Sequence, residues 1–310
     1  MKKFKLLSII DTHDYTLNEI YQGQLYERMQ QLISVDFITL DDILKNKSIN
    51  FKDYDVVYCS LKIRNTLQYL RQLSTFLNGH QVIIQDYDPW VNYIDDSPYK
   101  NCYSTINSSL NVKSFFVSAK FWSDKLNVDN IKSTPIKLGM LSKHVHNPTM
   151  YPSRTNLIEF RGSKHPLRIK GMNELINATI PVNWGSTIKP YSNFLNHLQT
   201  ISIWAHNELF ITVNNQKYEA NSLWPKALEV LSQGCFLLRD KQSEAMWYDM
   251  YDIPSTFLFD DVKHAKLLYE QICNMSIKEK NERITYTINF IKNKDYFGDI
   301  IHQIIECARS

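Results

Sequence analysis

Glycine is scarce in this sequence, and cysteine pairs with the spacing of metal or redox sites are absent. Only 8 of the 310 residues are glycine, and the first apolar segment, residues 4–10, runs into Asp11 without a glycine-rich loop. The five cysteines are scattered and odd in number, which argues against a zinc site or a disulfide framework and favours a reduced, cytoplasmic setting. No apolar run is long enough to span a membrane, and the start lacks the small-residue cleavage site of a signal peptide.

An excess of charge of one sign is also missing, since the formal net charge is only +3. A value this small neither identifies a nucleic-acid-binding protein nor excludes one. Hydrophobic residues make up 44% of the chain and charged residues 22%, so we expect the chain to bury substantial cores. The length suits two α/β domains of ordinary size.

The first half of the chain alternates between apolar segments of strand length and segments with helical spacing. Strands are expected at residues 4–10, 35–40, 55–60, 81–85 and 114–118. One helix is expected where Leu25, Met29 and Leu32 recur. Another is expected from Ile63 to Leu77, with Gly79 at its C-terminal cap. This alternation is typical of a mostly parallel sheet that is covered on both faces.

The pattern restarts after a polar stretch with two prolines, residues 143–154, which is predicted to be a linker. Further strands are expected at residues 156–160, 180–185, 235–238 and 256–259. Further helices are expected at residues 166–178, 225–233, 265–274, 279–293 and 300–308. The sequence therefore predicts an α/β protein with two Rossmann-like domains, residues 1–147 and 148–310, and a helical tail.

Glu229 lies on a predicted helix, three positions after Lys226 and shortly before Gly234 and an apolar strand. A carboxylate in this place can accept both hydroxyls of a ribose, and the neighbouring lysine can meet a diphosphate. The alternative is an ordinary Lys–Glu pair on a solvated helix face. The spacing is compatible with both interpretations.

A basic turn, residues 161–168, joins a predicted strand to a predicted helix. The candidates in it are Gly162, Ser163, Lys164 and Arg168. Backbone N–H groups at a helix N-terminus favour an anion, and Lys164 or Arg168 would neutralise a pyrophosphate there. Positive side chains are otherwise unfavourable at this end of a helix, so a bound phosphate would explain them. A solvated basic turn is the alternative.

Asp86 comes directly after an apolar strand and two positions before Asp88. Ligands of open α/β sheets bind beyond the carboxyl ends of the strands, where Asp86 can act as the general base for an attacking hydroxyl. The alternatives are a divalent metal held by Asp86 and Asp88, and a simple strand-ending turn. Asp11 and His13 follow the first strand and are candidates for lining the same cleft.

Trp184 stands at the end of a predicted strand, where it can lie beside the base of a nucleotide, and a core position is the alternative. His144 and His146 lie two positions apart, but the sequence supplies no clear third ligand for them. We therefore predict no metal ligands.

Taken together, these segments resemble the GT-B glycosyltransferases, in which two Rossmann-like domains face each other across a cleft. Residues 226–238 look like the donor segment of that family, where a helix with a ribose-binding glutamate leads into glycine and an apolar strand. The C-terminal half is similar to glycosyltransferase-1-like transferases of polysaccharides. A more distant likeness extends to the T-even phage DNA β-glucosyltransferases.

The resemblance implies that the C-terminal domain binds a nucleotide sugar, with UDP-sugar favoured, and that the tail helix returns to the first domain. The site residues that it implies are Asp86 as the catalytic base, with Arg168, Lys164, Lys226 and Glu229 as donor ligands. Lys226 departs from the family's arginine and loses bidentate phosphate geometry. A second glutamate eight positions after Glu229 is missing, which favours inversion of the anomeric centre.

The sequence thus predicts a cytoplasmic glycosyltransferase that moves a sugar from a nucleoside-diphosphate sugar to a hydroxyl acceptor, with no tightly bound cofactor. The acceptor stays open between a base of phage DNA and a bacterial glycan, and the need for a divalent metal and the oligomeric state stay open as well. Two rivals remain. One is a metal-dependent, GT-A-like transferase that uses Asp86 and Asp88. The other is a non-catalytic two-lobed scaffold, which the missing glycine-rich loop keeps open.

Overall fold

The structure, a computed structural model, divides the chain into two compact units. It describes residues 4–13, 20–93, 97–145, 156, 158–161, 166–185, 201–203, 210–213, 216–219, 224–241 and 246–310. Unit 1 consists of Met1–Gly139, Ile211–Ser222 and Tyr296–Ser310, and unit 2 consists of Met140–Phe210 and Leu223–Asp295. The last helix of the chain is therefore part of the unit that contains the N-terminus.

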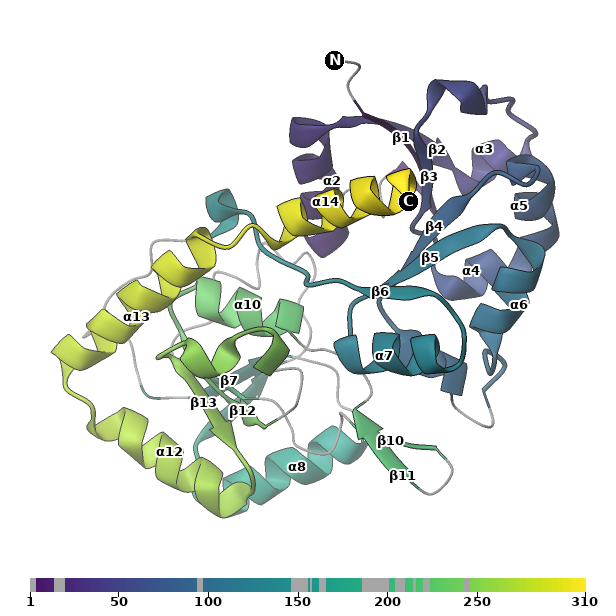
Figure 1. Ribbon diagram of the computed structural model, residues 1–310. Helices are drawn as coiled ribbons and strands as arrows, with labels where there is room; N and C mark the ends of the chain where they lie inside the picture. The colour runs from purple at the N-terminus through teal and green to yellow at the C-terminus, as the bar shows by residue number, and fades with distance from the viewer. Residues whose placement is uncertain are drawn as a thin grey trace. The chain divides into compact units, whose positions relative to one another are not determined.

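Unit 1 is built on a six-stranded parallel sheet with the strand order β2-β1-β3-β4-β5-β6 (Figure 1). The strands are β1 (Lys5–Ile10), β2 (Ser34–Thr39), β3 (Val56–Cys59), β4 (Val82–Asp86), β5 (Val112–Val117) and β6 (Ser133–Pro135). Strand β1 has β2 on one side and β3 on the other, so the order of strand addition reverses there. Ligands of open α/β sheets bind at such a topological switch point, beyond the carboxyl ends of the strands.

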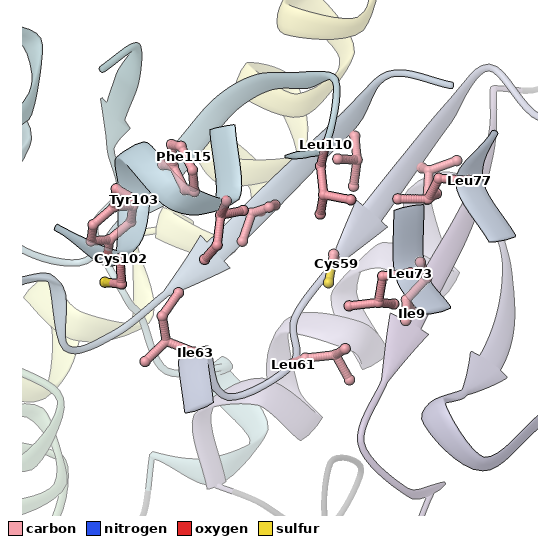
Figure 2. Packing of buried hydrophobic residues seen from close by; sticks show 14 of the residues in the cluster. Ile9, Cys59, Leu61, Ile63, Leu73, Leu77, Cys102, Tyr103, Leu110 and Phe115 are labelled. Atoms are coloured by element: carbon pink, nitrogen blue, oxygen red, sulfur yellow. The ribbon is translucent and has the colours of Figure 1, made fainter. Parts of the chain in front are cut away.

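One face of this sheet carries the main hydrophobic core of unit 1. The helices of unit 1 are α2 (Ile20–Leu32), α3 (Leu40–Leu44), α4 (Ile63–Gln68), α5 (Leu70–Leu77), α6 (Cys102–Ser109), α7 (Lys120–Val128) and α14 (Tyr296–Arg309). Alternate strand residues such as Ile9 and Cys59 pack against Leu73 of α5 and Tyr103 of α6 in a single buried cluster (Figure 2). Asp86 continues the alternation of Val82 and Ile84, and it therefore extends from this face.

The opposite face of the sheet packs against α2 and α14 and carries polar side chains within its buried layer. Ser8 of β1 and Ser60, just after β3, both form hydrogen bonds with the hydroxyl of Tyr26 on α2. Helix α14 contacts α2 and β5, and it buries a row of three isoleucines, Ile300, Ile301 and Ile304, each at 1% exposure or less. The C-terminal helix therefore completes this layer of unit 1.

Gly139, at the end of the first stretch of unit 1, lies against the start of α14. A Cβ atom on residue 139 would come within 3.1 Å of the Cβ atom of Tyr296. This distance is shorter than ordinary van der Waals contact, so the absence of a side chain permits the close approach.

Unit 2 is built on a second parallel sheet, with the order β13-β12-β9-β7-β8. Its strands are β7 (Ile158–Arg161), β8 (Val182–Gly185), β9 (Ile201–Ile203), β12 (Phe236–Asp240) and β13 (Thr256–Phe259). Its helices are α8 (Pro166–Asn177), α10 (Trp224–Ser232), α12 (Val262–Asn274) and α13 (Ile277–Lys292). Helix α10 contacts β12 and α13, and α12 covers β12 and β13.

Short elements complete the described chain. Strands β10 (Phe210–Val213) and β11 (Gln216–Glu219) pair with each other. The 3-10 turns within the described ranges are η1 (Phe51–Asp53), η2 (Pro89–Tyr93), η3 (Ser142–His144) and η5 (Met250–Asp252). None of the helices in the described ranges combines the length and the hydropathy that crossing a membrane requires.

The α/β class predicted from the sequence, with two Rossmann-like sheets, is confirmed. One helix was predicted wrongly: residues 63–77 form α4 and α5, because Tyr69 at φ −111° and ψ 24° interrupts the helical conformation. The single-domain fold of the GT-A-like alternative is also wrong, since the chain forms two separate parallel sheets in two units.

Candidate active site

A cavity of about 360 Å³ lies in unit 1 beyond the carboxyl ends of β1, β3 and β4. Residues that follow each of these strands line it, among them Asp11 after β1, Ser60 after β3 and Asp86 at the end of β4. The cavity therefore occupies the topological switch point between β1 and β3, where the fold places ligands. Its volume lies in the range of small-molecule binding sites.

Asp86 is held in this cavity by two hydrogen bonds. The hydroxyl of Tyr103, on α6, donates to Oδ2 of Asp86 at 2.6 Å, and the backbone N–H of Asp88 donates to Oδ1 at 3.1 Å. The second bond is the strand-ending turn that the sequence offered as an alternative, and it coexists with a place in the cavity wall. Each carboxylate oxygen has a second lone pair, so a substrate hydroxyl can still donate to Asp86.

The environment of Asp86 raises the pKa of its carboxyl group to about 6. Burial is the main cause, since only 8% of the residue is exposed, and the nearby negative charge of Asp88 adds to it. The hydrogen bonds from Tyr103 and Asp88 oppose this shift. A carboxyl group with a pKa near 6 is ionised at neutral pH and is a stronger base than an ordinary aspartate.

The other cleft candidates have different surroundings. Asp88 lines the cavity, and its Oδ1 accepts a hydrogen bond from Nε1 of Trp90 at 3.3 Å. Asp11 also lines the cavity, while its carboxylate accepts hydrogen bonds from Nδ2 of Asn65 and from the backbone N–H of Lys62. His13 is exposed, with its ring 6.2 Å from that of Phe37, and it takes no part in the described cavity wall.

Several residues of the cavity wall were not among the candidates chosen from the sequence. Gln85 stands next to Asp86 on β4, and its Oε1 accepts a hydrogen bond from the hydroxyl of Tyr58 at 2.6 Å. Lys62 and Arg64 bring positive charge to the wall from the segment after β3. The signal that would have identified Gln85 is a polar side chain within an otherwise apolar strand.

Glu229, the candidate ribose ligand, lies on α10 of unit 2 and is fully buried, at 0% exposure. The alternative interpretation, in which Glu229 lies on a solvated helix face, is therefore wrong. Helix α10 leads through Gly234, at φ +70°, into β12, as the sequence predicted. The other donor candidates lie outside the described part of the structure. This holds for the whole residue in Gly162, Ser163 and Lys164, and for the side chain in Arg168, Trp184 and Lys226.

Acidic, histidine and cysteine side chains do not gather into a metal-binding group within the described parts of either unit. Asp86 and Asp88 lack a third such ligand there, and Asp86 is already engaged by Tyr103. The sequence leaves metal dependence open.

Replacing Tyr103 by phenylalanine is expected to raise the pKa of Asp86 further, because the hydroxyl of Tyr103 lowers that pKa in the native protein. The free energy of unfolding at pH 8 should fall by about 1.5–3 kcal/mol, as for a lost hydrogen bond to a charged group. A titration of ¹³C-labelled aspartate by NMR measures the pKa, and urea unfolding measures the stability.

The matched control for this substitution is Tyr26→Phe. Tyr26 is equally buried, but its hydroxyl bonds to Ser8 and Ser60 on the other face of the sheet. This variant should lose stability without a change in the pKa of Asp86. An unchanged pKa in Tyr103→Phe would contradict the role assigned to its hydroxyl.

Comparison with known proteins gives matches by structure alone. No family model matches the chain, and no curated protein sequence does. Two UDP-forming α,α-trehalose-phosphate synthases are similar in structure at 7% sequence identity. The match to the synthase from Burkholderia xenovorans covers 99% of this chain and 99% of the synthase chain, with a TM-score of 0.58. The match to the synthase from Burkholderia vietnamiensis covers 99% of this chain and 98% of the synthase chain, with a TM-score of 0.60.

A third similar structure is that of a trehalose-6-phosphate synthase studied for enzymatic glycosyl transfer with retention. It shares 9% sequence identity with this chain and has a TM-score of 0.55. The match covers 96% of this chain and 86% of the synthase chain. These structures match both units of the chain, in agreement with the two parallel sheets described above. The resemblance to GT-B glycosyltransferases is confirmed at the level of fold, and the chain has the GT-B fold.

Proposed function

We propose that the protein is a glycosyltransferase that moves a sugar from a UDP-sugar to a hydroxyl acceptor bound in the cavity of unit 1. The observation that carries the proposal is Asp86, a buried carboxyl group with a pKa of about 6 in a cavity at the switch point of a GT-B fold. The choice of UDP is supported by the UDP-forming enzymes of similar structure.

In the proposed reaction, Asp86 takes the proton of the acceptor hydroxyl as its oxygen attacks C1 of the donor sugar. The bond between C1 and the diphosphate oxygen breaks, and UDP leaves with the bonding electron pair. Proton transfer by a positioned carboxylate contributes typically about 10²–10⁴-fold to such a rate. A single displacement of this kind inverts the configuration at C1.

The donor side of the site is assigned to unit 2. Glu229 binds the ribose hydroxyls, Arg168, Lys164 and Lys226 stabilise the leaving diphosphate, and the turn at Gly162 and Ser163 supplies backbone N–H groups. Trp184 lies beside the base. Support comes from the order of elements in unit 2, where α10, which carries Glu229, leads through Gly234 into β12 as in the donor segment of the resemblance.

A thermal-unfolding screen against nucleoside diphosphates, with and without Mg²⁺, tests this donor site. UDP at one hundred times its Kd should raise the free energy of unfolding by about 2.7 kcal/mol. Glu229→Gln keeps the shape of the buried side chain and should lose most of this gain. Glu282→Gln, on an exposed position of α13 in the same unit, is the control and should keep it.

Activity assays and analysis of the product test whether the protein is an enzyme and whether Asp86 is its base. Hydrolysis or transfer of the sugar distinguishes an enzyme from the non-catalytic scaffold, and stabilisation by no nucleotide at all would contradict the transferase. The anomeric configuration of the product tests the base: an inverted product agrees with Asp86 as base, and a retained product rejects a single displacement through Asp86.

A further inference from the structure

Gln85 and Asp86 lie next to each other on β4 and extend from opposite faces of the sheet. Asp86 faces α6, where Tyr103 holds it. Gln85 faces the polar layer of unit 1, where the hydroxyl of Tyr58 donates to its Oε1. Both residues lie in the wall of the same cavity.

The hydroxyl of Tyr58 bonds to the oxygen end of the Gln85 amide. Because Oε1 is engaged by Tyr58, the Nε2 group is the free end of the amide, and it has no hydrogen-bond partner among the described residues. Gln85 is only 2% exposed, so bulk water does not solvate this donor. Buried amide donors in proteins are nearly always satisfied, and an exception at a cavity indicates the place of a ligand oxygen.

The charges of the cavity wall narrow the class of ligand. Among the described residues of the wall, three carboxylates line the cavity, from Asp11, Asp86 and Asp88, and two cations, Lys62 and Arg64. Carboxylates accept hydrogen bonds from hydroxyls and repel phosphates. A hydroxyl of a sugar or polyol both donates and accepts, so neighbouring hydroxyls can satisfy a carboxylate and the Gln85 amide together.

We propose that Gln85 is a specificity-determining residue for the acceptor, that Tyr58 is its positioning residue, and that the acceptor class is a sugar or polyol. The Nε2 group donates to a hydroxyl or ring oxygen of the acceptor, on the same molecule whose reacting hydroxyl meets Asp86. This inference rests on the proposed function, because it assigns the acceptor side of the same site.

Saturation-transfer NMR on the full chain tests the proposal directly. The probes are D-glucose, N-acetyl-D-glucosamine and myo-inositol, each at millimolar concentration and each with and without UDP. A twelve-base-pair DNA duplex, titrated separately at low salt, represents the other acceptor class. The variants are Gln85→Met, which has similar length and no polar hydrogen, and Tyr58→Phe, which frees the amide to rotate.

We expect at least one of the three sugar or polyol probes to bind, and the duplex not to compete with it. Gln85→Met should weaken that binding by about five- to tenfold, the effect of one buried hydrogen bond. Tyr58→Phe should weaken it by about threefold. The affinity for UDP should stay unchanged in both variants, whereas a merely structural defect would weaken both ligands.

The control variant is Tyr54→Phe. Tyr54 donates its hydroxyl to Asp36 at the opposite end of β3, away from the cavity, and its loss should leave probe binding unchanged. Thermal melting of each variant establishes that it is folded.

The proposal is overturned if none of the three probes binds while UDP does, if the duplex displaces the probe, or if Gln85→Met binds it as tightly as the native protein. Should Gln85→Met fail to fold, an unchanged probe affinity in Tyr58→Phe overturns it instead. Failure of UDP to bind, with probe binding intact, would reject the proposed function and leave this cavity as a sugar-binding site.

Discussion

Replacing Asp86 by asparagine is expected to lower the transfer rate by about 10²–10⁴-fold and to stabilise the protein at pH 8. Asparagine fills the same space but cannot take a proton from the acceptor hydroxyl, so the catalytic contribution of the base is lost. The affinity for UDP should not change, because the donor site is assigned to unit 2.

The gain in stability follows from the raised pKa of Asp86. The unfolded chain ionises this carboxyl near its ordinary pKa of about 3.9, while the folded protein does so at about 6. The folded state thus binds the proton more tightly, and the stability from this carboxyl is fully present below pH 4 and is lost as the pH rises through 6.

At pH 8 the buried negative charge therefore costs about 3 kcal/mol, and Asp86→Asn removes that cost. The variant also loses one acceptor for the hydrogen bonds from Tyr103 and Asp88. This loss lowers the expected gain in stability by about 1 kcal/mol. We expect a net gain of about 1–2 kcal/mol at pH 8 that disappears near pH 4.

Urea unfolding between pH 4 and pH 8 measures this dependence, and initial rates measure the loss of transfer. Asp124→Asn, on an exposed position of α7, is the control and should change the stability by less than about 0.5 kcal/mol at any pH. Full activity in Asp86→Asn would show that Asp86 is not the base. A loss of stability at pH 8 would show that its ionised form is structural.

Replacing Ile304 by aspartate is expected to destabilise unit 1 by about 3–5 kcal/mol and to leave unit 2 folded. Ile304 is at 0% exposure on α14, which packs on α2 and β5. The substitution removes a buried aliphatic side chain and places a charge in the same layer, and both changes are strongly unfavourable.

Hydrogen exchange followed by mass spectrometry separates the two units. Peptides from β1, β4 and α2 should exchange faster in Ile304→Asp, while peptides from β12 and α13 should keep their protection. The control is His302→Asp at an exposed position of the same helix, for which we expect a change of about 0.5 kcal/mol. Equal loss of protection in both units would contradict the assignment of α14 to unit 1.

The sequence predicted most strands closely because their apolar runs are bounded by polar residues. Thr256–Phe259 agrees residue for residue with β13, and Val82–Asp86 differs by one position from the expected strand. Helices α6 and α7 were missed. In α6, Cys102–Ser109, polar residues outnumber apolar ones, so the periodicity is weak although Cys102, Tyr103 and Ile106 are buried.

The site was predictable only where it depends on strand ends. Asp86 was identified because a parallel sheet brings the carboxyl ends of its strands to one edge. Tyr103 lies seventeen positions away on α6, and only tertiary packing brings its hydroxyl to Asp86. Tyr58 lies on β3 and Gln85 on β4, and no pattern in the sequence pairs them.

The placement of α14 in unit 1 has a consequence for synthesis on the ribosome. The strands of the first sheet all emerge by residue 135, yet the helix that covers α2 and β5 emerges only at the end of the chain. At roughly 5–20 residues per second, this layer stays uncovered for about ten seconds or longer. During that interval the nascent chain exposes the apolar surface that Ile300, Ile301 and Ile304 later bury, which makes it a natural client for chaperones.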